Sequence, residues 1–196
     1  MPVTFHSCVT CQTGDVHHEF VTGNLALDYV ATVAERGTTR HEHLAAPEDL
    51  AEWIAQAGIV DGPVAVTPAG LGQAKVIREA LFALVEAMID GGPAPREALR
   101  VVNQAAAAPP PTPVLQDAAL HREGDLDAVL SALARTALEL LGGPERARVK
   151  WCAGEDCTRP FVDRSRGGRR RWCGMAGCGD RAKAAAYRAR QRERGR

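Results

Sequence analysis

The spacing of four cysteines near the end of the chain restricts its fold more than any other feature of the sequence. Cys152 and Cys157 are separated by four residues, fifteen residues follow, and Cys173 and Cys178 are again separated by four. Structural zinc is bound by four ligands in a tetrahedron, and each close pair of thiolates can supply one edge of it. The spacing therefore predicts one structural zinc ion held by these four cysteines. Because such a site has no open position, we expect the metal to stabilise the fold and not to catalyse a reaction.

Two disulfides are the alternative interpretation of the four cysteines, and the rest of the sequence argues against them. The N-terminus lacks the apolar stretch of a signal peptide, and no run of about 18 apolar residues occurs in the sequence. We therefore expect no membrane contact and a cytoplasmic location. Cysteines in that reducing compartment stay as thiols and are available to bind metal.

The charged residues of the chain are distributed very unevenly. The totals balance, with 24 Lys and Arg against 24 Asp and Glu, but residues 145–196 carry 16 basic and 6 acidic residues. Residues 1–144 carry the remaining 8 basic and 18 acidic residues. This asymmetry predicts two units with different partners, of which the basic one suits a polyanion.

The apolar pattern of residues 20–143 predicts an acidic domain of five helices. Most of the expected helices have a capping residue or a proline at the start and a glycine at the end. Proline-rich residues 105–124 predict an irregular crossing with a short edge strand at Val114 and Leu115. The expected helices span residues 24–37, 47–58, 67–91, 95–104 and 125–143, and a polar loop after the first of them carries His41 and His43.

The helical domain contains no catalytic motif and no phosphate-binding loop, so we expect that the protein is not an enzyme. Asp28 and Arg78 are the pair on which an enzyme hypothesis would rely, and a buried salt bridge between helices is the more ordinary role for both. Residues 1–19 are interpreted as a flexible tail. Its candidate metal ligands are spaced too closely for a zinc finger; they are Cys8, Cys11, His17 and His18.

The C-terminal unit is expected to be a finger of two short strands and a turn. Residues 149–151 and 160–162 predict the strands, and residues 165–168 predict the turn. A few aromatic side chains cannot fold about 45 residues alone, so zinc must contribute on the order of 10 kcal/mol. We expect Cys173→Ser to unfold this finger and to leave the helical domain intact. The aromatic residues expected to form the core of the finger are Trp151, Phe161 and Trp172.

A basic helix is predicted after the last cysteine. Asp180 is the expected N-cap, and the residues that follow are strong helix formers. Alanines form one face of this helix, and a row of basic residues flanks that face on each side. Such a helix suits a groove of duplex DNA, with one basic row for each phosphate wall. We expect nucleic-acid contacts from Arg169, Arg170, Arg171, Arg181, Lys183 and Arg188.

In the alternative interpretation these basic residues do not bind nucleic acid. Four thiolates on one zinc ion carry a formal charge of −2, which the arginines at 169–171 would neutralise. A basic helix at the end of a chain can also be a solvated tail.

The C-terminal segment resembles the CGNR zinc finger family. The matching residues are the four cysteines, Phe161-Val162-Asp163-Arg164-Ser165, Arg170-Arg171-Trp172-Cys173-Gly174-Met175 and Cys178-Gly179-Asp180-Arg181-Ala182-Lys183. Upstream, Gly23-Asn24-Leu25-Ala26-Leu27-Asp28-Tyr29 is similar to the start of the ABATE domain, which precedes this finger in bacterial proteins. The resemblance covers about residues 20–192. It implies a stress-related transcription regulator, with the finger on DNA and a helical domain that senses an effector or pairs with another copy.

We therefore expect a mainly α fold with a tail (1–19), a helical ABATE-like sensor domain (20–144) and a treble-clef-like zinc finger with a short β-hairpin and a basic helix (145–196). The expected partners are double-stranded DNA and an unknown small-molecule effector. We also expect a second copy of the chain, because one basic helix reads only a short site. An RNA- or protein-interaction module with a structural zinc finger is the alternative.

Two residues depart from the family pattern. Asp180 stands where the family has Asn, which adds a negative charge beside the expected phosphate contact. Ala31 stands where many relatives have Asn, so no ligand contact is carried over to that position.

Overall fold

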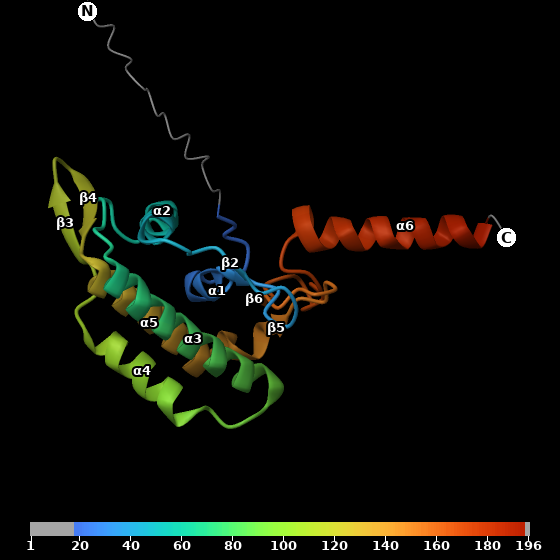
Figure 1. The fold of residues 1–196 in the computed structure, drawn as a ribbon, viewed down its shortest axis with the longest axis horizontal. Coiled ribbons are helices and arrows are strands. Elements are labelled where there is room, and N and C mark those ends of the chain that lie inside the picture. Colours follow the sequence, from blue (N-terminus) through green and yellow to red (C-terminus); the bar gives the residue numbers. More distant parts are fainter. Residues whose placement is uncertain (1–17, 195–196) are drawn as a thin grey trace, which may run out of the picture.

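Among residues 18–194, five helices form the body of the protein, and a sixth projects from it (Figure 1). The computed structural model describes residues 18–194. The projecting helix is α6 (Asp180–Arg194), which continues from a π-helical turn at Met175–Gly179. The helices of the body are α1 (Leu25–Val30), α2 (Pro47–Ala57), α3 (Pro68–Asp90), α4 (Arg96–Ala107) and α5 (Leu126–Gly142), followed by a 3-10 turn at Pro144–Arg148. The prediction of a mainly α fold is confirmed.

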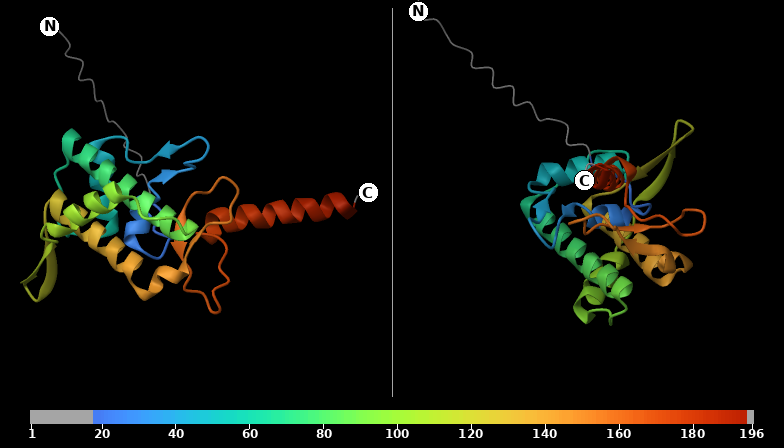
Figure 2. Two further views of the ribbon diagram at one scale, coloured as in Figure 1. Left: turned by 90° about the horizontal axis from the view of Figure 1, so that it is seen from below. Right: turned by 90° about the vertical axis from the view of Figure 1, so that its right-hand side faces the viewer.

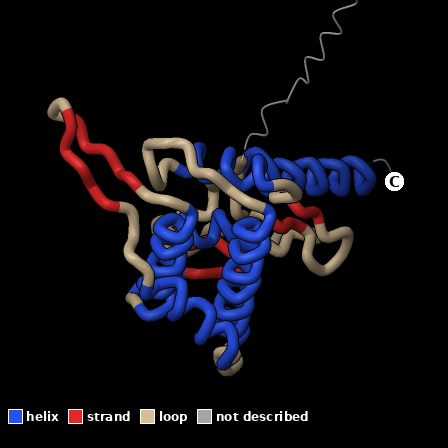
Figure 3. Tube along the Cα trace, turned by 60° about the vertical axis from the view of Figure 1, so that its left-hand side comes forward, coloured by secondary structure: helices blue, strands red, loops and turns tan. Residues whose placement is uncertain are grey.

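Three antiparallel hairpins complete the described part of the chain (Figure 3). The hairpin of β3 and β4 extends from the helices as an arm, and the hairpin of β5 and β6 has the two strands predicted for the finger. The pairs are β1 (Val33–Ala34) with β2 (His41–Glu42), β3 (Thr112–Gln116) with β4 (Ala119–Glu123), and β5 (Val149–Trp151) with β6 (Pro160–Val162).

The ends of the helices show why the sequence predicted most of them. The side chains of Thr67 and Asp125 each accept a hydrogen bond of 3.0 Å from a backbone N–H in the first turn of α3 and α5, respectively. Helices α2 and α3 end at Gly58 and Gly91, which are in the left-handed conformation with φ of 62° and 74°. Capping residues and terminal glycines therefore set the bounds of these helices, as predicted.

The five helices of the body share one apolar core. The rings of Tyr29 and Trp53 are buried with their centroids 5.2 Å apart. The Tyr29 hydroxyl donates a hydrogen bond of 2.6 Å to the carbonyl of Ala74, so its polar atom is satisfied inside the core. The surrounding core side chains are aliphatic, among them Leu50, Leu81, Val102, Leu130 and Leu133.

The first helix is shorter than predicted, because α1 ends at Val30, seven residues before the expected end. The Thr32 hydroxyl donates a hydrogen bond of 2.7 Å to the carbonyl of Tyr29, and the chain then turns into β1. β-branched side chains at this point favour a strand over a helix. His41 consequently lies in β2 and not in a loop, with its ring centroid 4.6 Å from that of His43.

Residues 105–124 also differ from the prediction. Helix α4 continues three residues further than expected, and a complete hairpin replaces the irregular crossing with one edge strand at Val114 and Leu115. The two turn residues, Asp117 and Ala118, have φ of 50° and 61°. Two-residue turns of this kind usually contain glycine or asparagine. Because this turn contains neither, the hairpin has no clear signal in the sequence.

The finger is attached to the helical body by Trp151 and by a second apolar cluster. The Trp151 indole N–H donates a hydrogen bond of 3.0 Å to Asp90, and the Trp151 ring centroid is 5.9 Å from that of Phe82. Trp151 therefore packs on α3 and not in the core of the finger, where the sequence analysis placed it. The residues of this cluster, named here the interdomain cluster, are Leu27, Val85, Leu140, Val149 and Val162.

Candidate metal centre

The four predicted zinc ligands come together at one point. The Sγ atoms of Cys152, Cys157, Cys173 and Cys178 all lie within 4.8 Å of one another. Sγ of Cys173 is 3.9 Å from that of Cys157 and 3.8 Å from that of Cys178. Zinc–sulfur bonds of about 2.3 Å at tetrahedral angles place sulfur atoms about 3.8 Å apart, whereas a disulfide needs about 2.05 Å. The four free thiols therefore fit one zinc ion.

The ligands belong to separate segments of the finger. Cys152 directly follows β5, and Cys157 lies in the loop that leads to β6. Cys173 ends the long loop after β6, and Cys178 lies in the π-helical turn that continues into α6. A zinc ion bound here joins the β5–β6 hairpin to the base of α6.

Hydrogen bonds to sulfur support thiolates at this site. Sγ of Cys152 accepts hydrogen bonds from the backbone N–H groups of Gly154 at 3.4 Å and Cys173 at 3.3 Å. The guanidinium of Arg181 donates to Sγ of Cys178 at 3.2 Å. The hydrogen bond with Cys173 lowers the pKa of the Cys157 thiol to about 5, whereas burial raises the pKa of the Cys152 thiol. Such donors stabilise the ligands in the charged form that zinc requires.

Two glycines allow the backbone to approach the site closely. A Cβ atom at Gly154 would lie 2.9 Å from Sγ of Cys178, and a Cβ atom at Gly179 would lie 2.8 Å from the sulfur of Met175. The distance at Gly154 is shorter than a side chain tolerates, whereas the exposed Met175 side chain can move away from a Cβ atom at Gly179. The cysteine spacing alone did not identify Gly154, because its role depends on a ligand that is distant in the sequence.

Arg170 contributes to the structure of the finger through several internal contacts. Its guanidinium lies 4.7 Å from the centroid of the buried Phe161 ring. It donates hydrogen bonds to the carbonyl of Trp172 at 2.9 Å, to that of Val21 at 2.7 Å and to that of Cys173. These bonds link the helical body to the loop that carries the third zinc ligand.

The other predicted nucleic-acid contacts are exposed. Arg169, Lys183 and Arg188 are open to solvent, and the exposed Arg171 has its guanidinium 5.3 Å from the Trp172 ring centroid. Helix α6 has no buried residue and extends away from the body (Figure 1). Among residues 18–194 the structure has no helix that is long and apolar enough to cross a membrane.

Asp180 does not cap α6, contrary to the sequence analysis. The helical backbone already begins at Met175, and the N–H of Asp180 donates to carbonyls of the preceding π-helical turn. The Asp180 carboxylate instead lies 3.3 Å from Nζ of Lys183. Helix propensity alone does not predict the π-helical turn that contains Cys178.

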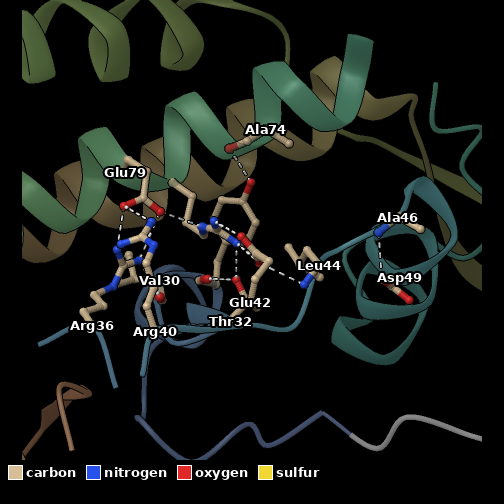
Figure 4. A network of polar contacts seen from close by, with 12 residues as sticks. Val30, Thr32, Arg36, Arg40, Glu42, Leu44, Ala46, Asp49, Ala74 and Glu79 are labelled. Carbon is tan, nitrogen blue, oxygen red and sulfur yellow. Dashed lines mark hydrogen bonds and ion pairs between the residues drawn. The ribbon is translucent and has the colours of Figure 1, made fainter. Parts of the chain in front are cut away.

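Asp28 and Arg78 do not pair with each other. The Asp28 carboxylate accepts a hydrogen bond of 3.0 Å from the backbone N–H of Thr22, and burial raises its pKa. Arg78 instead pairs with Glu42 on β2. Figure 4 labels Glu42 together with Thr32 and Glu79 in the same network of polar contacts. The sequence analysis missed Glu42, because it placed this residue in a polar loop and not in the hairpin that positions it.

A small polar cavity of about 220 Å³ lies beside Asp28 and extends to the finger. His18 and His43 line it, together with Arg159, which also donates to Glu19 at 2.6 Å and contacts Sγ of Cys173 at 3.9 Å. Cys8, Cys11 and His17 lie outside the described residues. Arg159 had no signal in the sequence, because only the fold brings it between the cavity and the zinc ligands.

A helical body joined to a four-cysteine site and a basic helix defines a zinc-finger protein. Residues 23–144 match the ABATE family, described as "Putative stress-induced transcription regulator", and residues 148–191 match the CGNR zinc finger. The chain therefore belongs to the ABATE family and carries a C-terminal CGNR zinc finger with one structural zinc ion. No curated protein matches the chain.

Proposed function

We propose that the protein is a transcription regulator that binds duplex DNA through α6 and the basic loop after β6. The observation that carries this proposal is the state of α6: a basic helix with no buried residue, fixed at its base to the zinc centre. Fifteen residues span about 22 Å. A helix with its side chains is about 10–12 Å in diameter. It therefore fits the major groove of B-DNA, which is about 12 Å wide.

The zinc ion supplies a structural cross-link in this proposal, and the residues of the chain do the rest. Cys178 lies at the base of α6, and the Arg181 guanidinium in the first turn of the helix donates a hydrogen bond to the Cys178 sulfur. An isolated helix of this length is only marginally stable in water. Without the anchor, α6 would have no contact to hold it in a fixed direction.

The helical body is proposed to sense an effector or to form a homodimer. The cavity that Asp28 and Arg159 share is one place for a small polar effector, because Arg159 reaches from it to Cys173. We propose no enzymatic role, since four thiolate ligands leave zinc without an open position. We also place the protein in the cytoplasm, where these thiols stay reduced.

Duplex DNA binding should depend on zinc and fall steeply with salt. In fluorescence anisotropy between 50 and 300 mM salt, contacts to about five phosphates give a log–log slope of about −4.5. Protein treated with a chelator should lose this binding, and adding zinc back should restore it. A zinc-loaded, folded protein that does not bind duplex DNA at 50 mM salt would contradict the proposal, and binding to RNA instead would favour the alternative of an RNA-interaction module.

A further inference from the structure

The two basic rows of α6 have different surroundings. A groove of about 570 Å³ runs along the base of the helix. Arg181, Ala185 and Arg188 line it on the α6 side. Facing them are Cys178 and three carboxylates from the β1–β2 turn and the loop between β5 and β6, those of Glu35, Glu155 and Asp156.

Helix geometry assigns the remaining basic residues to one side or the other. At about 100° per residue, Arg192 falls within about 40° of Arg181 and Arg188 around the axis, on the side of the groove. Lys183, Arg190 and Arg194 fall together on the opposite side of the helix. Tyr187, whose side chain is 58% exposed, lies next to this second row. We name the two sets the groove row and the outer row.

The acidic rim makes the groove row a poor site for phosphate. A DNA strand placed there would lie against the three carboxylates and beside a zinc–thiolate centre with a formal charge of −2. Arg181 is already bonded to Sγ of Cys178. Phosphate is repelled by such a surface, and its repulsion increases as water is excluded.

The outer row has a basic neighbour instead. Viewed almost along α6 in Figure 2, the β1–β2 turn and the loop after β6 lie on opposite sides of the helix. That loop exposes Arg166, Arg169 and Arg171. The buried carboxylate of Asp163 fixes its start, accepting hydrogen bonds from Lys150 at 2.7 Å and from the Ser165 hydroxyl at 2.6 Å. The loop and the outer row therefore face solvent, and the acidic residue beside them, Asp180, already pairs with Lys183 at 3.3 Å.

We propose that the outer row of α6 and the loop after β6 form the DNA-binding surface, while the groove row faces away from the phosphates. This inference rests on the proposed binding to duplex DNA and specifies the face that carries it. It departs from the symmetrical arrangement that the sequence suggests, in which both rows reach a phosphate wall.

Two double variants with the same loss of charge test the assignment. Arg190→Ala with Arg194→Ala removes two outer-row cations, and Arg188→Ala with Arg192→Ala removes two groove-row cations with the same spacing. Neither variant touches Arg181, and alanine maintains the helix. On the full chain with zinc bound, the outer-row variant should lose about tenfold or more in affinity for a DNA duplex, and its salt slope should become shallower by about 1.8. The groove-row variant should keep the slope of the wild type.

Each result distinguishes the face from the function. Equal losses in both variants would overturn the assignment of the face and leave DNA binding in place. A larger loss in the groove-row variant would overturn it as well. If the zinc-loaded wild type ignores duplex DNA, the proposed function fails first and this inference fails with it. Zinc content and circular dichroism, measured on every variant, confirm that a loss of affinity is not a loss of folding.

Discussion

Replacing Cys173 with serine is expected to unfold the finger and also to destabilise the helical body. Zinc supplies on the order of 10 kcal/mol of folding free energy to a small finger. The finger has little else to hold it, since Phe161 is its one fully buried aromatic ring among the described residues and Trp151 packs on α3. The sequence analysis expected the helical domain to stay intact, but the interdomain cluster changes that expectation.

The cost to the body arises from the surfaces that the finger covers. Unfolding of β5 and β6 removes Val149 and Val162 from the side chains of Leu27, Val85 and Leu140, which then face water. Exposing parts of three aliphatic side chains costs roughly 3 kcal/mol. The body of the Cys173→Ser variant should therefore unfold at a lower denaturant concentration than the body of the zinc-loaded wild type, as followed by far-UV circular dichroism.

A matched control comes from the same turn. Ala176 is exposed between Cys173 and Cys178, so Ala176→Ser adds a hydroxyl without removing a ligand. This variant should bind one zinc ion and unfold like the wild type. If Cys173→Ser retained a dispersed amide spectrum for residues 145–194, the four-thiolate site would not be what folds the finger. An unchanged transition of the body would show that the interdomain cluster contributes nothing to its stability.

The sequence predicts features that depend on local chemistry. The four cysteines identify a zinc site, because the spacing within each pair is set by one turn of backbone. Thr67, Asp125 and the terminal glycines fix helix ends through hydrogen bonds and φ angles within a few residues. Strands β5 and β6 follow from short apolar runs beside a turn. Each of these signals lies in the segment whose structure it predicts.

Features that depend on contacts between distant segments were not predicted. Trp151 is an aromatic residue of the kind expected in the core of the finger, but its partners Phe82 and Asp90 lie about 60 to 70 positions earlier in the chain. Arg170 reads as one of three basic residues in a row, and only the positions of the Val21 and Cys173 carbonyls give it a structural role. The acidic rim of the α6 groove likewise combines residues from two hairpins.

Arg78 carries the second large expected effect. Its side chain is 1% exposed, and its guanidinium donates two hydrogen bonds of 2.7 Å to the Glu42 carboxylate. It also donates to the Thr32 hydroxyl at 3.1 Å and to Glu79 at 3.1 Å. The bonds tie α3 to the β1–β2 hairpin, which short strands of two residues could not hold in place alone.

Arg78→Ala should therefore destabilise the body by about 3 kcal/mol, the lower end of the range for breaking a buried ion pair. The lower end applies because Glu42 and Glu79 are 30% and 38% exposed and can regain water. In a chain of this size the melting temperature should fall by roughly 6 to 12 °C. Arg100→Ala removes an exposed arginine that pairs with Glu97 and should leave the melting temperature unchanged within error. Equal effects of the two substitutions would show that burial of the Arg78 pair contributes nothing.

The same network predicts how stability changes with pH. Burial raises the pKa of Glu42, but hydrogen bonds from Arg78 and from the Leu44 N–H outweigh it, so that the pKa is lowered overall. The pKa of Glu79 is also lowered, because the hydrogen bond from Arg36 and the charge of that guanidinium outweigh burial. Both carboxylates thus stabilise the fold above their ordinary pKa of about 4.5, and this contribution is lost as pH falls through their lower folded values. Because the substitution removes the bonds to Arg78, the difference in unfolding free energy between wild type and Arg78→Ala should be constant at neutral pH and shrink below about pH 4. A difference that stayed constant down to pH 3 would mean that Arg78 stabilises the body by packing alone.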